Sequence, residues 1–436
     1  MPAVPSVPAP ERTAARPLHR HRLGNGLRLL VAPDPDCPAV GIAVAYGVGY
    51  RSESRSGFAH LFEHLMFQGG ANLAAQEHAR LVQANGGAFN GTTHRDHTDY
   101  FQALPAEALE LGLFLEADRM RAPRITPRAI ATQASVVAEE IHRSVLNRPY
   151  GGFPTFLLPP VLFRGWANTH DGYGDHTALG EATVEECAAF FDRHYTPGNA
   201  VLALCGGVRP EQAVELAERY FGPIPARPTA AGPDLDEPPL AAPRTVEHAD
   251  PLAPLPALAL GLRMPPAGSR AHLAAVVTAA LLGDGETGRL RRSLVRERGL
   301  ATQATATAGL GGPFDARDPD AFVVSALHPP GVAARDVVDA IAAELGSLAG
   351  DGPGPAELHR AVRRLQTSWY AATDPVGVRA RRLAGYELLL DDGGLALDAA
   401  SRFATVGAAE VRSAAADLAA QHPALLHVVP GRKETR

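Results

Sequence analysis

Residues 57–70 read GFAHLFEHLMFQGG, and this stretch is the most informative part of the chain. Its apolar residues recur at helical spacing, so we expect a helix with one face toward a core. His60 and His64 occupy positions i and i+4, which places both imidazoles on one face, about 6 Å apart and within reach of one cation. Glu63 lies beside them. The alternative is a surface helix that carries two unrelated histidines.

These residue types fit a catalytic zinc site. Zinc held by three protein ligands keeps a fourth position for water, whose pKa it lowers, and an adjacent carboxylate can take the proton. His60 and His64 would supply two ligands, and Glu63 the base. The three cysteines of the chain are widely separated and have no CxxC spacing, so any further ligand must be a histidine or a carboxylate.

The order H-x-x-E-H is the inverzincin signature, and the segment around it resembles the M16 family of peptidases. The similarity is greatest to the shorter, M16B-like members, such as the mitochondrial processing peptidase beta subunit and bacterial zinc-bearing subunits. Further segments follow in the family's order and at its spacings: NGL near position 25, FNGTTHRDHTDY (89–100), SVVAEEI (135–141), NRPYG (147–151), HYTPGNAVLALCGGV (194–208) and YFGPIP (220–225).

The resemblance implies an α+β fold of two homologous α/β sandwich domains, of the LuxS/MPP-like type, that together form half of a clamshell. We expect the catalytic domain at residues 19–226 and a second domain without a metal site at 245–436. The stretch 227–244 is rich in Pro, Ala and acidic residues, which is typical of a linker. Residues 1–18 are rich in Pro and Ala, and we expect a disordered leader there.

In the family, the third zinc ligand is a glutamate on a later helix, about 76 residues beyond the second histidine. At that spacing the resemblance implies Glu140, with one zinc ion per chain. Glu139 is the competing residue, but neighbours on a helix point about 100° apart, so only one of them can face the metal. The family usually has another glutamate seven residues earlier. Here that position is Gln133, so the shell of residues behind the ligands has lost a charge, a change that would weaken or retune metal binding.

The segment that begins at Phe89 resembles the strand along which M16 enzymes bind the substrate main chain. An exposed sheet edge offers free N–H and C=O groups to an extended peptide. By the family's motif, Asn90 would contact the scissile carbonyl, and Gly91 and Thr92 would pair with the substrate. The alternative is an ordinary turn-rich strand. His94 and His97, farther along the segment, are not assigned to the metal.

The second half lacks an arginine and tyrosine pair that, in single-chain M16 enzymes, anchors the substrate and stabilises the oxyanion. Val295 occupies the arginine position and Thr302 the tyrosine position, while Arg296 is displaced by one residue. The segment that corresponds to HxxEH contains His272 but no base and no second ligand. M16B proteins often occur in pairs, so we expect a homologous partner subunit that supplies the missing residues; a homodimer is the alternative.

Composition excludes several other classes. No apolar run approaches the roughly 20 residues that cross a bilayer, and no Lys/Arg block is long enough to follow a nucleic acid backbone. We therefore expect a cytoplasmic zinc metalloendopeptidase for short or unfolded peptides, with leader or presequence processing as one form of this activity. The alternatives are a non-catalytic M16-like scaffold and a zinc-stabilised binding module, whose metal would be fully coordinated by protein and would not need Glu63.

Overall fold

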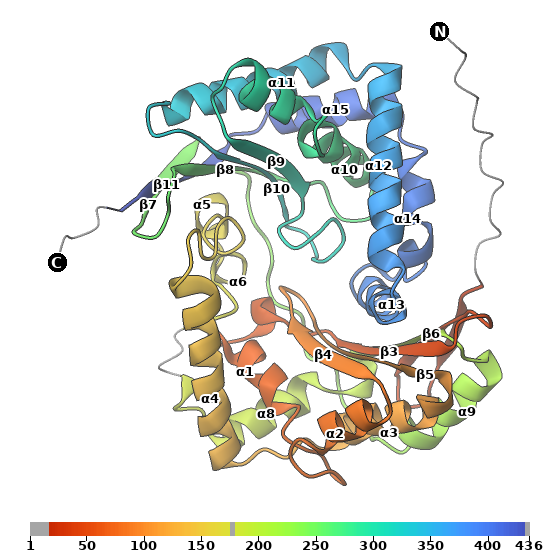
Figure 1. Cartoon of the computed structure of the whole chain (residues 1–436). Coiled ribbons are helices and arrows are strands. Elements are labelled where there is room, and N and C mark those ends of the chain that lie inside the picture. Colours follow the sequence, from red (N-terminus) through yellow and green to blue (C-terminus); the bar gives the residue numbers. More distant parts are fainter. Residues whose placement is uncertain (1–16, 175–178, 432–436) are drawn as a thin grey trace.

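The computed structural model describes residues 17–174 and 179–431, so the predicted leader at 1–18 lies almost wholly outside the described residues. Two mixed sheets, each with helices packed against it, form two α/β halves that face each other (Figure 1). The α+β fold class expected from the sequence is confirmed. In the part of the chain that the structure describes, no helix is both long and apolar enough to span a membrane.

The first half is built on a six-stranded sheet. In sheet order, its strands are β1 (His19–Arg22), β2 (Arg28–Pro33), β6 (Ala200–Gly206), β3 (Ala39–Tyr46), β5 (Thr98–Pro105) and β4 (Ala88–Thr93). Strands β2 and β6 are parallel, and the other neighbours are antiparallel. The buried strands β3 and β6 lie in the middle of the sheet, and β4 forms one edge.

Helices cover the lower face of this sheet in Figure 1. The helices and helical turns of this half are η1 (Tyr50–Ser52), α1 (Phe58–Leu65), α2 (Glu77–Ala84), η2 (Ala106–Ala108), α3 (Leu109–Arg121), α4 (Pro127–Ile141), the π-helical turn η3 (His142–Leu146), α5 (Pro159–Leu162), α6 (Trp166–Thr169), α8 (Val184–His194), η4 (Pro197–Asn199) and α9 (Pro210–Phe221). Residues 225–243, which include most of the predicted linker, contain no helix or strand and lead into the second half.

The second half repeats this plan with a five-stranded sheet. Its strands, in sheet order, are β7 (Arg244–Asp250), β11 (Ala424–Pro430), β8 (Ala257–Arg263), β10 (Ala321–Leu327) and β9 (Gln303–Ala308). Its helices are α10 (Arg270–Gly283), the π-helical turn η5 (Arg291–Glu297), α11 (Ala334–Asp351), α12 (Pro355–Thr373), α13 (Val376–Leu390), α14 (Leu395–Phe403) and α15 (Ala408–Ala419).

Each half covers the open face of the other half's sheet. Helix α13 of the second half lies on β3, β5 and β6 (Figure 1), and a Cβ atom at Gly41 would overlap the carbonyl of Val376. In return, Leu158, Leu162 and Phe163 of the first half pack with the buried side chains of β8, β10 and β11. The two halves therefore share apolar cores, and the position of one fixes the position of the other.

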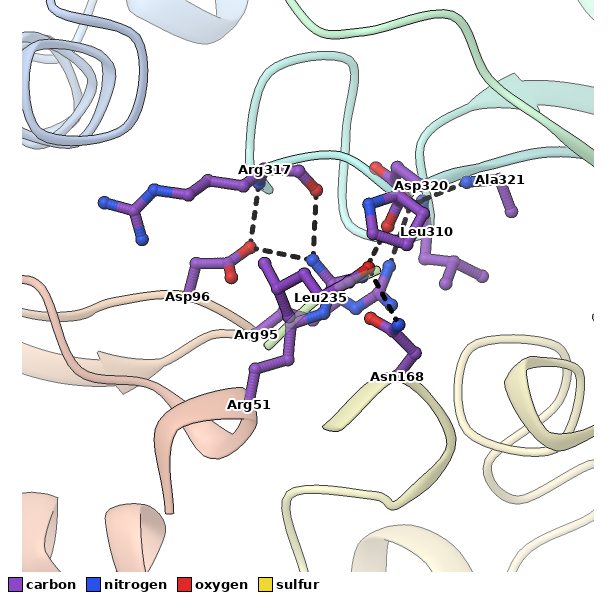
Figure 2. Close-up of polar contacts among 10 residues, drawn as sticks. Arg51, Arg95, Asp96, Asn168, Leu235, Leu310, Arg317, Asp320 and Ala321 are labelled. Atoms are coloured by element: carbon purple, nitrogen blue, oxygen red, sulfur yellow. Dashed lines mark hydrogen bonds and ion pairs between the residues drawn. The ribbon is translucent and has the colours of Figure 1, made fainter. Parts of the chain in front are cut away.

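A buried network of ion pairs and hydrogen bonds also connects the two halves (Figure 2). Arg51 Nη1 lies 3.2 Å from Asp96 Oδ2 and donates to the Arg317 carbonyl at 3.0 Å, while the Arg317 N–H donates to Asp96 at 2.8 Å. Arg95 Nη1 donates to Asp320 Oδ1 at 3.0 Å. Arg51 lies just before α1, and Arg95 and Asp96 form the turn after β4. The network thus fixes the entry to α1 and the end of β4 against the second half.

Removal of the Asp320 carboxylate tests how much this network stabilises the fold. Burial raises the pKa of Asp320, so the pair with Arg95 is strongly desolvated, and a partner left alone in such a site destabilises a fold by about 3–5 kcal/mol. We expect Asp320→Ala to lower the free energy of unfolding by this amount in urea denaturation. The control is Asp284→Ala, which breaks the more exposed pair with Arg364 and should cost no more than about 1 kcal/mol. Equal, small losses would contradict the role of the network.

Candidate metal centre

Three potential ligand atoms converge from helices α1 and α4. Nε2 of His60 and Nε2 of His64 lie 3.8 Å and 3.5 Å from Oε2 of Glu140, and the two imidazole rings are 5.0 Å apart. Zinc bonds of about 2.0–2.1 Å in a tetrahedral arrangement place ligand atoms about 3.4 Å from one another. The three side chains therefore fit one zinc ion with little rearrangement. All three retain some solvent exposure, which leaves a face of the site open.

The α4 helix presents Glu140, and not its neighbour, to the histidines. Thr126 caps the start of this helix by accepting the Ala129 N–H at 3.1 Å, and Pro127 occupies its first turn. Glu139 is exposed on the outer side, whereas Glu140 faces α1. Gln133, two turns earlier on α4, is buried, and its interaction with the His64 side chain helps to raise the pKa of that imidazole. Gln133 thus lies beside a potential ligand, and its role behind the metal stays a prediction.

The electrostatics of the group suit a metal site. Burial, with the nearby His64, lowers the pKa of His60 to about 4, so His60 is neutral and able to bind a metal. Burial alone would lower the pKa of His64, but its hydrogen bond to Glu140 and the charges of Glu63 and Glu140 outweigh this and raise it. The hydrogen bond with His64 in turn lowers the pKa of Glu140. Burial raises the pKa of Glu63, as expected for a general base.

Glu53 fixes the start of the α1 helix, a role that the sequence analysis missed. Gly57, the N-cap residue, has no side chain with which to cap the helix and has a φ of +83°. Glu53 caps the helix in its place. Its two carboxylate oxygens accept the N–H groups of Gly57 and Ala59, each at 2.7 Å. His170 Nε2 lies 3.3 Å from the same carboxylate. A glutamate four residues before the N-cap lies outside the usual capping patterns, which is why no motif indicated it.

The β4 strand brings alternate side chains against α1. The Phe89 ring packs on Phe67, with ring centroids 5.4 Å apart, and a Cβ atom at Gly91 would lie 3.1 Å from Glu63 Oε1. Thr93 donates its hydroxyl hydrogen to Glu63 Oε2 at 2.7 Å. Thr93 was not among the residues expected from the sequence, and it contacts the base more directly than any of them.

The register of β4 decides which main-chain groups are free at the sheet edge. The His94 N–H donates to the His97 carbonyl at 2.8 Å, and hydrogen-bonded pairs alternate along an antiparallel ladder. The main chain of Asn90 and Thr92 therefore bonds to β5, and that of Gly91 and Thr93 points to the open edge. Thr92, which the sequence analysis expects to pair with a substrate, is turned away from the edge, and Thr93 takes that place.

The Asn90 side chain is exposed and folds back along the strand. Its Oδ1 accepts the N–H of Gly91 at 3.0 Å, which covers one of the edge-facing donors. A peptide that adds to this edge would have to displace this contact. The predicted contact between Asn90 and a scissile carbonyl therefore requires a rotation of the side chain.

His94, His97 and Asp99 form a second group of potential ligands, and their atoms also lie close together. Arg381 of α13 already occupies this group. Its guanidinium contacts both Asp99 oxygens at 3.0 Å and 3.1 Å and lies 3.3 Å from His94 Nε2. A cation would have to displace the partly buried Arg381 guanidinium from the buried Asp99 carboxylate, so the group is better explained as an ion pair between the two halves.

The second half contains no comparable centre in the part of the chain that the structure describes. His272 is buried between the carbonyls of Pro265 and Pro313. Arg296 pairs with Glu286 on the surface, and the Thr302 N–H donates to the Leu327 carbonyl at 2.8 Å. Val295 packs at the margin of the second core. None of these residues reaches the His60 site.

The HxxEH order on helix α1 is the signature of the inverzincin type of protein, and comparisons with known proteins agree. Residues 28–149 match the family model described as insulinase (peptidase family M16), and residues 181–365 match the model described as the peptidase M16 inactive domain. Together these matches cover more than half of the chain. The chain belongs to the M16 family of peptidases.

Individual relatives cover the chain to different extents. The zinc protease PqqE of Helicobacter pylori is 30% identical over 65% of this chain and 64% of its own length, so the chain aligns with less than two thirds of that protein. An uncharacterized zinc protease of Streptomyces coelicolor is 25% identical over 95% of this chain and 90% of its own. The crystal structure of a protease from Helicobacter pylori has the same fold, with a TM-score of 0.86, 24% identity and coverage of 95% and 100%.

Substitution at the two adjacent glutamates distinguishes the predicted third ligand. Glu140→Ala removes a potential ligand atom, so we expect zinc affinity to fall by at least about 100-fold, more than a residue behind the ligands would cause. Glu139→Ala, the matched control, should retain zinc because that side chain faces solvent. Zinc content after dialysis and a competitive chelator titration measure both. If only the Glu139 variant lost zinc, the third ligand would be Glu139 and not Glu140.

Proposed function

We propose that this protein is a zinc-dependent metalloendopeptidase subunit that hydrolyses peptide bonds in short or unfolded peptides. The observation that supports this most is the convergence of His60, His64 and Glu140, with the Glu63 carboxylate beside them. The names of the relatives as zinc proteases point in the same direction. Processing of a leader or presequence is one form that this activity can take.

The residues of the chain divide the chemistry between them. When bound, zinc would polarise the scissile carbonyl and lower the pKa of water at its open position. Glu63 would take the proton of the attacking water and return it to the leaving amine. His60, His64 and Glu140 would hold the metal, and Gln133 would orient His64 from behind.

The open edge of β4 supplies a means of binding the peptide. The main-chain groups of Gly91 and Thr93 face this edge, next to Glu63. An extended peptide that pairs with them would be bound through its main chain, with little dependence on its side chains. Such binding suits unfolded segments, because a folded substrate has its own main-chain groups already paired.

A non-catalytic M16-like scaffold is the competing function. It is favoured by the match of residues 181–365 to a family model described as an inactive domain. A scaffold has no need of Glu63, yet this carboxylate is held beside the candidate ligands by Thr93. A zinc-stabilised binding module is a weaker alternative, because its metal would be enclosed by four protein ligands. Among the described residues only three ligand atoms converge here.

We propose a partner subunit because the second half lacks the arginine and tyrosine pair of single-chain M16 enzymes. Val295 and Thr302 occupy the positions of the family's arginine and tyrosine, so a homologous M16B subunit would have to supply these groups in a heterodimer. Homodimer formation is the alternative. A chain that cleaves unfolded peptides alone as fast as it does with a homologous subunit encoded nearby would remove the partner proposal and leave the metal site unaffected.

Glu63→Gln tests the proposed mechanism. The change keeps the shape of the side chain and removes its basicity, so zinc should remain bound while turnover of a quenched fluorescent peptide library falls about 10²- to 10⁴-fold. Glu139→Gln makes the same chemical change on the solvent side of α4 and should leave the rate unchanged. A Glu63→Gln variant that retains both zinc and full activity would rule out this mechanism and favour a scaffold.

A further inference from the structure

Thr93 is the last residue of β4 and makes a direct contact with the candidate base. Its hydroxyl donates to Glu63 Oε2 at 2.7 Å, a short distance typical of a hydrogen bond to a charged acceptor. Both side chains are half-buried, so water competes only in part for this bond. Thr93 lies within the segment FNGTTHRDHTDY, whose resemblance to the family implies roles for Asn90, Gly91 and Thr92 but none for Thr93.

The alternation of β4 explains why this residue reaches Glu63. Side chains of a strand point to opposite faces in turn, so Phe89, Gly91 and Thr93 all face α1. Phe89 packs on the end of that helix, and Gly91 leaves the space that the Glu63 side chain occupies. A Cβ atom at Gly91 would lie 3.1 Å from both Glu63 Cγ and Glu63 Oε1, so Glu63 would have to shift slightly to admit a side chain. The Glu63 side chain therefore lies next to Gly91, and its Oε2 is bonded to Thr93.

We infer that Thr93 is a positioning residue that fixes the orientation of the Glu63 carboxylate. The last torsion of a glutamate side chain is broad, so an unrestrained carboxylate would present either oxygen to the open face. With Oε2 bonded to Thr93, Oε1 is the oxygen left to accept a proton. This inference rests on the proposed function, because it assigns Thr93 a role only if Glu63 acts as the base.

Thr93 also connects this orientation to the binding edge. Its main-chain N–H and C=O point to the open side of β4, where an extended peptide would add. One residue thus contacts the base through its side chain and borders the peptide site through its main chain.

Thr93→Val tests the inference because valine keeps the shape of threonine and lacks the hydroxyl. We expect kcat to fall about ten- to hundred-fold, the effect of a hydrogen bond to a charged group, while KM changes less than about threefold because the main chain is intact. Thr93→Ser restores the hydroxyl and should recover most of the loss. Zinc content and thermal stability should match those of the unmodified chain in both variants.

A double-mutant cycle separates this role from a general effect on the strand. In a Glu63→Ala background the hydrogen bond is absent, so Thr93→Val should cause no further loss of the residual rate. If Glu63→Ala lowers kcat at least about 100-fold to a measurable residual rate and Thr93→Val leaves kcat within about twofold, the positioning role is wrong and the proposed function stands. If serine fails to restore kcat, the hydroxyl is not responsible. If Glu63→Ala keeps full activity, the proposed function fails, and the inference with it.

Discussion

The structure of this protein centres on one constraint: side chains from two separate helices must converge on one point. His60 and His64 come from a single turn of α1, and Glu140 comes from α4, with ligand atoms 3.5 Å and 3.8 Å apart. Burial and the nearby His64 lower the pKa of His60, whereas the pairing with Glu140 outweighs burial and raises the pKa of His64. The surrounding fold has to hold both helices rigidly for the three groups to meet.

Contacts around the site hold the start of α1 and the end of β4 in place. Glu53 fixes the first turn of α1, and Arg51, two residues earlier, is bound to Asp96 and to the Arg317 carbonyl of the second half. The same network holds the turn after β4, so the base and the edge strand are anchored together. Helix α13 lies on the other face of the sheet. The second half therefore contributes to the site through support, although none of its described residues reaches the candidate ligands.

Sequence reasoning predicted those features that depend on local periodicity or on a fixed family spacing. The i, i+4 spacing gave the approach of His60 and His64, and the family spacing gave Glu140. Sequence reasoning could not identify Glu53 or Thr93, because a helix cap from four residues before the N-cap and a hydrogen bond from a strand to a helix depend on the three-dimensional packing. The hydrogen bond from the His94 N–H to the His97 carbonyl sets which residues of β4 bond to β5. The main chain of Thr93 therefore faces the open edge, where the sequence predicts Thr92. The contact of α13 with the first sheet joins residues far apart in the chain, and no linear pattern reports it.

The central claim is that His60, His64 and Glu140 bind one zinc ion together. X-ray absorption spectroscopy at the zinc edge, with anomalous diffraction from zinc-loaded crystals, tests it most directly. We predict one zinc per chain, between α1 and α4, with two imidazole nitrogens and a carboxylate oxygen at about 2.0–2.2 Å. A zinc ion at His94, His97 and Asp99, or a site at α1 and α4 that stays empty when zinc is in excess, would contradict this account.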